Sequence, residues 1–226
     1  MSLYSKKIND VTFNDIRSFV DIGLREDVRL DYKEDFPSNL AKIVTAFSNT
    51  AGGIVLIGVR ASRDTNQPEV ITGVPLIVGL EEKVTNITMS NIRPPVSPEV
   101  KICPYKSNAN LAADDRAVII VRVSESNIAP HSETSNNSIW VRNHNVCNQA
   151  SLDIIEKLLE KRDRRNSLIE KIQKEANEIL ITAPAGFPTF EGQKRYFSIA
   201  LSPLYPLSIT FNKSKDDFLS LTTFDM

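Results

Sequence analysis

An acid and a base stand two residues apart in the segment Asp31-Tyr32-Lys33. The alternating pattern of residues 29–36 predicts a strand, on which the two charged side chains share a face. Such a carboxylate can hold Mg²⁺ or Mn²⁺ in a nuclease, while the lysine orients water or stabilises a phosphate. A metal would need further oxygen ligands. The alternative interpretation is a surface salt bridge, and the spacing alone leaves both open.

The elements that must position this pair follow it directly. Residues 40–49 carry apolar side chains on one helical face, and residues 54–59 read as a strand buried on both faces. Between them, Asn49, Gly52 and Gly53 tolerate the positive φ that a chain reversal requires. The glycine spacing matches no nucleotide-binding loop, so we interpret these residues as a structural turn.

Periodicity predicts the other elements. Helices are expected at 12–24, 80–92 and 152–180, and further strands at 70–74, 100–105, 117–123 and 139–142. The segment KRDRRN at 161–166 has no apolar residue, and we expect it to form a solvated bend or connector. The pattern as a whole is α/β (α+β), with a mixed sheet flanked by helices.

Several motifs occur in the order of a known family: Glu26, Asp31-Tyr32-Lys33, AFSNTAGG at 46–53, IGV at 57–59, VIIVRVSESNIAPH at 118–131 and IWVRN at 139–143. The chain resembles the Schlafen/AlbA-type domain family over roughly residues 20–160. We expect a domain of this type at 1–150. The helical pattern predicts a connector at 151–180, and the loops and short strands expected after Pro184 indicate a small C-terminal region at 181–226 that could belong to a second module.

The resemblance implies nucleic-acid binding, with DNA as the ligand and transcriptional regulation as the setting, and for this function we expect no cofactor. A second hypothesis is a metal-dependent endoribonuclease like the Schlafen RNases. There Glu26, Asp31 and Asp64 would act with Lys33, and Glu26 and Asp31 would hold Mg²⁺ or Mn²⁺. A third hypothesis is a protein-interaction module with no role on nucleic acid.

Three arginines follow or lie in predicted strands: Arg60, Arg122 and Arg142. If they point to the same face as Lys33, the four side chains would form a compact surface for backbone phosphates. The alternative interpretation is that each arginine is simply solvated.

Composition limits these readings. The 226 residues carry a net charge of −1, with a pI near 6.2, whereas dedicated nucleic-acid binders usually have a basic patch. We therefore expect local geometry or a homodimer to supply the site, with apolar positions at 152–180 as the dimer contact. No apolar run reaches membrane-helix length, the N-terminus lacks a signal-peptide pattern, and the two cysteines suit a reducing cytoplasm.

Overall fold

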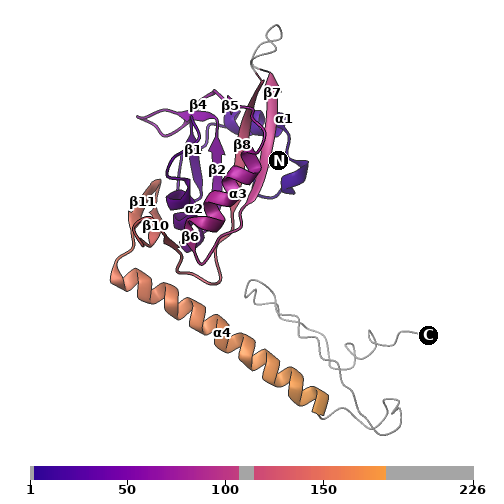
Figure 1. Ribbon diagram of the computed structural model, residues 1–226, viewed down its shortest axis with the longest axis vertical. Coiled ribbons are helices and arrows are strands. Elements are labelled where there is room, and N and C mark those ends of the chain that lie inside the picture. The colour runs from indigo at the N-terminus through magenta and orange to yellow at the C-terminus, as the bar shows by residue number, and fades with distance from the viewer. Residues whose placement is uncertain (1–2, 107–114, 182–226) are drawn as a thin grey trace, which may run out of the picture. The chain divides into compact units, whose positions relative to one another are not determined.

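The computed structural model describes residues 3–106 and 115–181 (Figure 1). Its helices are a 3₁₀ turn η1 (Ile8–Asp10), α1 (Phe13–Asp21), α2 (Leu40–Asn49), α3 (Leu80–Ser90) and α4 (Leu152–Ile181). Its strands are β1 (Leu30–Lys33), β2 (Gly53–Ile57), β3 (Val59–Ala61), β4 (Pro68–Ile71), β5 (Val74–Pro75), β6 (Ile92–Arg93), β7 (Glu99–Lys106), β8 (Asp115–Val123), β9 (Ser132–Glu133), β10 (Trp140–Asn143) and β11 (Val146–Gln149).

The central sheet mixes parallel and antiparallel pairs. β1 runs parallel to β2, and β2 pairs antiparallel with β8. β5 and β7 also pair antiparallel with β8, which leaves β1 at one end of the strand order. The remaining strands form three two-stranded pairs: β3–β4, β6–β9 and β10–β11. The predicted α/β class with a mixed sheet is confirmed.

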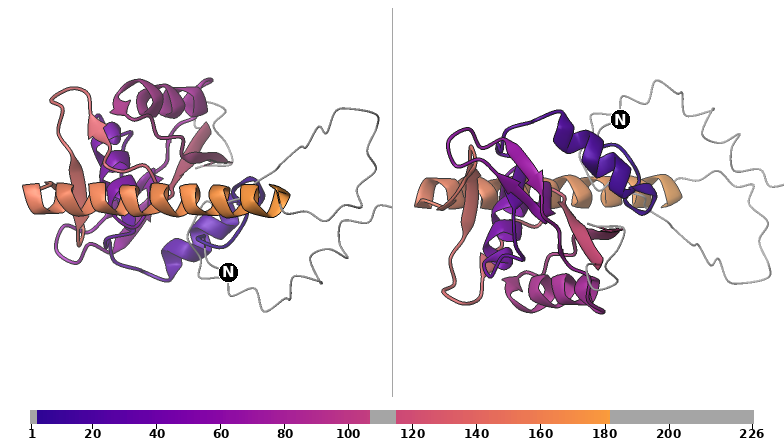
Figure 2. Two further views of the ribbon diagram at one scale, coloured as in Figure 1. Left: turned by 90° about the horizontal axis from the view of Figure 1, so that it is seen from below. Right: turned by 90° about the horizontal axis from the view of Figure 1, so that it is seen from above.

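Two apolar layers sandwich this sheet. Val55 and Ile57 of β2 face the layer that contains α2 and α3, whereas Ile54 and Leu56 face the layer that contains α1 and the N-terminal segment. Figure 2 shows α1 and α3 on opposite sides of the strands. β2 is therefore buried on both faces, as its composition predicted.

The turn between α2 and β2 confirms the glycine prediction. Gly52 has a φ of +64°, which favours glycine. A Cβ atom there would lie 2.6 Å from the carbonyl oxygen of Val123 on β8. At Gly53 a Cβ atom would lie 2.5 Å from the carbonyl oxygen of Arg29. Both glycines thus let the backbone pass within contact distance of neighbouring backbone.

The C-terminal helix departs from the prediction. α4 is continuous over Leu152–Ile181, so the bend expected at 161–166 was wrong. Lysine and arginine are good helix formers, and a polar segment without glycine or proline continues a helix.

The chain divides into two compact units, Met1–Asp163 and Arg164–Met226. The domain boundaries expected at 150 and 180 stay predictions, and residues 182–226 lie outside the described part.

No helix among the described residues combines the length and the apolar character that crossing a membrane demands.

Candidate functional site

Asp31 and Lys33 lie on one face of β1, as the strand period predicted. They align with Val55 and Ile57 of β2, so both side chains belong to the layer of α2. The Lys33 ammonium forms an ion pair with Asp31 Oδ2. The pair is not a surface salt bridge, because the Asp31 side chain is only 4% exposed, whereas that of Lys33 is 31% exposed. The acid is interior and the base stands at the boundary with solvent.

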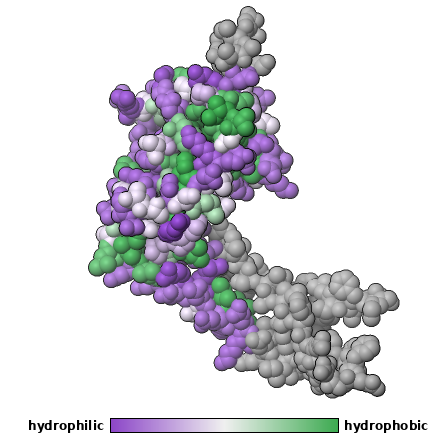
Figure 3. Space-filling view, in the orientation of Figure 1, coloured by the Kyte–Doolittle hydropathy of each residue, from purple (hydrophilic) through white to green (hydrophobic). Residues whose placement is uncertain are grey.

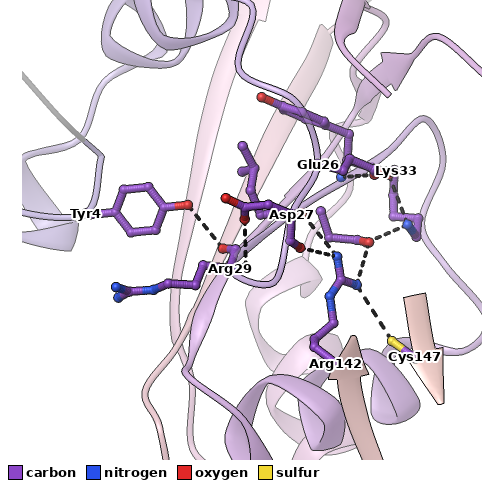
Figure 4. A network of polar contacts seen from close by, with 10 residues as sticks. Tyr4, Glu26, Asp27, Arg29, Lys33, Arg142 and Cys147 are labelled. Atoms are coloured by element: carbon purple, nitrogen blue, oxygen red, sulfur yellow. Dashed lines mark hydrogen bonds and ion pairs between the residues drawn. The ribbon is translucent and has the colours of Figure 1, made fainter. Parts of the chain in front are cut away.

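Arg142 of β10 supplies the second partner of Asp31. Its Nη1 lies 2.8 Å from Asp31 Oδ1, and its Nη2 donates to the carbonyl oxygens of Asp27 at 2.9 Å and Leu30 at 3.1 Å (Figure 4). The guanidinium carbon lies 4.6 Å from the ring centroid of Phe47. Burial opposes the charge, but the attraction of Asp31 outweighs it, so the pKa of Arg142 lies above its usual value.

The end of α2 holds β10 in place. The backbone N–H of Arg142 donates to Thr50 Oγ1 at 2.8 Å. The Asn49 amide donates to the carbonyl oxygens of Trp140 and His131 at 2.9 and 2.8 Å, and its Oδ1 accepts from the His131 N–H at 2.8 Å. Asn49, which the sequence marked only as a turn residue, therefore joins three segments of the chain.

His131 is part of the same buried joint. Its Nδ1 lies 2.7 Å from the Pro94 carbonyl oxygen, which can only accept, so Nδ1 carries the proton. Its Nε2 then accepts from the Ser126 hydroxyl at 2.6 Å. Burial lowers the pKa of His131, which favours this neutral form. The ring has a structural role.

Glu26 caps the outer edge of β1. Its Oε1 accepts from the backbone N–H of Tyr32 at 2.8 Å. The Tyr32 carbonyl oxygen accepts from the Lys33 ammonium at 3.0 Å, and the Leu30 carbonyl oxygen accepts from Arg142. Burial raises the pKa of Glu26. These side chains thus form hydrogen bonds with the backbone groups of β1 that point away from β2. The bonds protect this edge of the sheet from pairing with another strand.

The three acids of the nuclease hypothesis do not form a metal centre in this structure. Among the residues that the structure describes, no three His, Cys, Asp or Glu side chains are placed to hold a metal ion. Asp64 is exposed in the segment between β3 and β4. The two carboxylate oxygens of Asp31 face Arg142 and Lys33, and Glu26 is engaged by a backbone amide.

The outer cations of the site are Lys33 and Arg60. Arg60 lies on β3 with its side chain 47% exposed. It faces the carboxylates of Glu34 at 3.6 Å and Glu69 at 3.8 Å, distances at which solvated ion pairs are weak. The role of Lys33 and Arg60 as phosphate contacts stays a prediction.

The four basic residues do not share one surface. Arg122 lies on the α1 side of the sheet, where its Nη2 donates to the carbonyl oxygens of Leu3 and Lys6 at 2.6 and 2.8 Å. Its Nη1 pairs with Glu99 at 3.1 Å. Arg142 is interior, as described above. The prediction of a compact four-residue surface was therefore wrong, because two of its members, Arg122 and Arg142, form hydrogen bonds within the protein.

Sequence reasoning found Asp31, Lys33 and Glu26, but it missed that Arg142 and Asn49 work together around them. The Asp31–Arg142 contact spans 111 positions in the chain, so no local spacing announces it. The one usable signal was an acid inside a strand whose neighbours are buried, since a buried carboxylate needs a partner cation.

The model of the Schlafen, AlbA_2 family matches residues 26–151. No curated protein sequence matches. Similar solved structures include the DIP2311 protein from Corynebacterium diphtheriae, with 16% identity and a TM-score of 0.39 over 60% of this chain and 30% of that one.

Another is the N-terminal domain of a RecG-related protein from Nitrosomonas europaea. It has 16% identity and a TM-score of 0.37, over 51% of this chain and 74% of that one. The family match rests on the sequence and covers more than half of the chain, including β1, the α2–β2 turn and the β10–β11 pair. The chain therefore belongs to the Schlafen, AlbA_2 family.

Proposed function

We propose that this chain binds nucleic acid through its backbone phosphates, with Lys33 as a contact. The proposed ligand is DNA, and the proposed setting is transcriptional regulation. Family membership supports a function related to nucleic acid. The observation that carries the choice of site is the placement of Lys33 at the exposed end of a buried charge network.

The charges around β1 favour an anion at this position. Asp31 carries one negative charge and faces two cations, Arg142 and Lys33. The Glu26 carboxyl interacts with all three groups, and burial raises its pKa, which favours its uncharged form. Arg142 lies in the interior with 1% of its side chain exposed, whereas Lys33 reaches solvent. The surplus positive charge of the trio is therefore presented by Lys33, and a phosphate approaching from solvent meets its ammonium first.

The surroundings limit the strength of this contact. Glu34 and Glu69 partly offset the charge of Arg60, and the whole chain carries a net charge of −1. Binding through phosphate contacts weakens as salt rises, and a few such contacts give little affinity to begin with. We therefore expect modest affinity at low salt and little retention at physiological salt, unless two copies combine their sites.

The test compares wild type with Lys33→Ala by fluorescence anisotropy, on a labelled duplex DNA and a labelled single-stranded RNA of mixed sequence. Loss of one phosphate contact should weaken binding roughly three- to tenfold. Lys101→Ala is the matched control. This partly exposed lysine of β7 aligns with Ile120, which faces the α1 layer, so its loss should change affinity little. Equal affinities for wild type and Lys33→Ala would reject the site.

A cleavage gel with and without Mn²⁺ separates the alternatives. The proposed function expects intact DNA and RNA in both lanes. Cleavage that requires Mn²⁺ and disappears in Asp31→Asn would instead establish the nuclease hypothesis. Absence of both binding and cleavage, together with a stable complex with another protein, would favour the interaction module.

A further inference from the structure

We propose that Arg142 is a positioning residue for the nucleic-acid site. It neutralises Asp31 from inside the protein, so that Lys33 keeps its charge available for phosphate. The inference rests on the proposed function, because it concerns the same lysine. It differs from the role that sequence analysis gave to Arg142, which was a direct contact with phosphate.

The hydrogen bonds of Arg142 exclude a direct contact in this conformation. One terminal nitrogen is used by Asp31, and the other donates to the carbonyl oxygens of Asp27 and Leu30. The ring of Phe47 covers the guanidinium at 4.6 Å. With 1% of the side chain exposed, a phosphate could reach Arg142 only after these contacts had broken.

The consequence for Lys33 follows from charge balance. Asp31 is 4% exposed, and a buried carboxylate requires a counter-charge. Of the two cations that pair with Asp31, only Lys33 would remain if Arg142 were absent. The Lys33 ammonium already pairs with Asp31 and donates to the Tyr32 carbonyl oxygen at 3.0 Å, and as the sole counter-charge of the buried acid it would be held there more tightly and would be a poorer partner for phosphate. With Arg142 present, two cations share one carboxylate, so the outer cation Lys33 is held less tightly and can turn to a phosphate.

Hydrogen bonds to the backbone of β10 hold Arg142 in position. Thr50 Oγ1 accepts from the N–H of Arg142, and Asn49 donates to the carbonyl oxygen of Trp140, two residues earlier on β10. The two side chains that end α2 thus fix the strand that carries the guanidinium. Cys147, its neighbour on β11, has its Sγ 3.7 Å from Arg142 Nη1 (Figure 4). The β10–β11 hairpin is therefore a structural part of the site.

The test is a rescue experiment by anisotropy on labelled duplex DNA. Arg142→Met should bind roughly three- to tenfold more weakly than wild type, as Lys33→Ala does, because Lys33 then serves Asp31 alone. Asp31→Asn/Arg142→Met removes both buried charges and leaves Lys33 unpaired. It should recover affinity to within about twofold of wild type. Adding Lys33→Ala to Arg142→Met should cause no further loss, whereas in wild type the same change weakens binding.

The double variant decides the question, since Arg142→Met leaves the buried Asp31 with Lys33 as its one counter-charge and could fail to fold. A folded double variant that binds as weakly as Lys33→Ala would overturn the inference and make Arg142 a direct contact. The proposed function fails separately, if Lys33→Ala binds as well as wild type.

If the variants do not fold, a measurement on the wild-type protein can test the positioning role of Arg142. The Nη protons of Arg142 should exchange with solvent much more slowly than those of the exposed Arg63, with and without DNA. Equally fast exchange of both arginines would show that the buried ion pair is open, which would contradict the positioning role.

Discussion

Burial decides what each charged side chain on β1 does. Asp31 and Lys33 are neighbours with opposite charge, yet one is interior and the other reaches solvent. Strand periodicity was sufficient to place them on one face. It could not identify Arg142 as the partner of Asp31, because the chain has many arginines and this contact depends on how distant segments pack. Truncating one member of such a buried pair typically costs about 3–5 kcal/mol.

Glu26 gives a prediction with a defined pH dependence. Burial raises its pKa above the usual value near 4.5, so the folded protein holds this proton more tightly than the unfolded chain does. Ionisation of Glu26 as the pH rises therefore lowers the free energy of unfolding. Glu26→Gln cannot ionise, yet it keeps an oxygen for the Tyr32 N–H. The variant should melt at a higher temperature than wild type at pH 7.

Thermal melts of Glu26→Gln between pH 4 and pH 7 check this expectation. The advantage of the variant over wild type should shrink as the pH falls and the wild-type carboxyl takes up its proton. Glu156→Gln, at an exposed position of α4, is the matched control and should follow the wild-type profile. A Glu26→Gln profile parallel to wild type across this range would contradict the burial argument.

At the scale of elements, the end of α2 connects segments that are distant in the sequence, because Asn49 forms hydrogen bonds with His131 and Trp140. Asn49→Ala removes three hydrogen bonds and leaves the buried N–H and C=O groups of His131 without that partner, so it should cost roughly 2–4 kcal/mol. Asn49→Asp keeps the acceptor but loses both donated bonds, so it should also destabilise. Urea unfolding measures both, and the exposed Asn86→Ala on α3 should stay within about 0.5 kcal/mol of wild type.

The α2–β2 turn permits a matched comparison between two glycines. Gly52 and Gly23 have similar φ values of +64° and +71°, but a Cβ at Gly23 meets nothing nearer than Gln67 Nε2 at 3.9 Å. Gly23→Ala should therefore cost about 1 kcal/mol for backbone strain alone. Gly52→Ala adds the close contact with Val123 and should cost more than about 2 kcal/mol. Equal costs in urea unfolding would refute the close-packing argument.

The sequence predicted the elements whose patterns are local. The AFSNTAGG segment contains both the helical face and the turn glycines, so α2, the reversal and β2 were all expected. β11 was missed because Val146–Gln149 lacks an apolar run and is defined by pairing with β10. The bend expected at 161–166 was wrong because polarity was taken as a break, although helix propensity continues through it.

On the scale of the whole molecule, the charge is nearly balanced. On the face that Figure 3 shows, hydrophilic residues predominate and apolar residues gather in a few patches. The net charge of −1 means that any attraction for nucleic acid must come from local placement of cations. The network around β1 is the placement that we propose, and a second copy of it would double the number of proposed phosphate contacts.

A homodimer is the corresponding prediction. At a protein concentration of roughly tens of micromolar, sedimentation should give the mass of two chains. α4 is the expected contact, because it exposes Leu152 and Leu168. Ile172→Asp, on the same helix, should shift the equilibrium toward monomer, whereas the adjacent exposed Gln173→Asp should not. A wild-type monomer in this range would contradict the prediction.

The most direct test of the central claim is the salt dependence of DNA binding by wild type and Lys33→Ala. The logarithm of the association constant falls linearly with the logarithm of salt concentration, by about 0.9 for each phosphate contact on duplex DNA. If Lys33 presents the surplus charge of the buried trio, Lys33→Ala should have a slope smaller by about one, while Lys101→Ala keeps the wild-type slope. Identical slopes and affinities for wild type and Lys33→Ala would contradict the account.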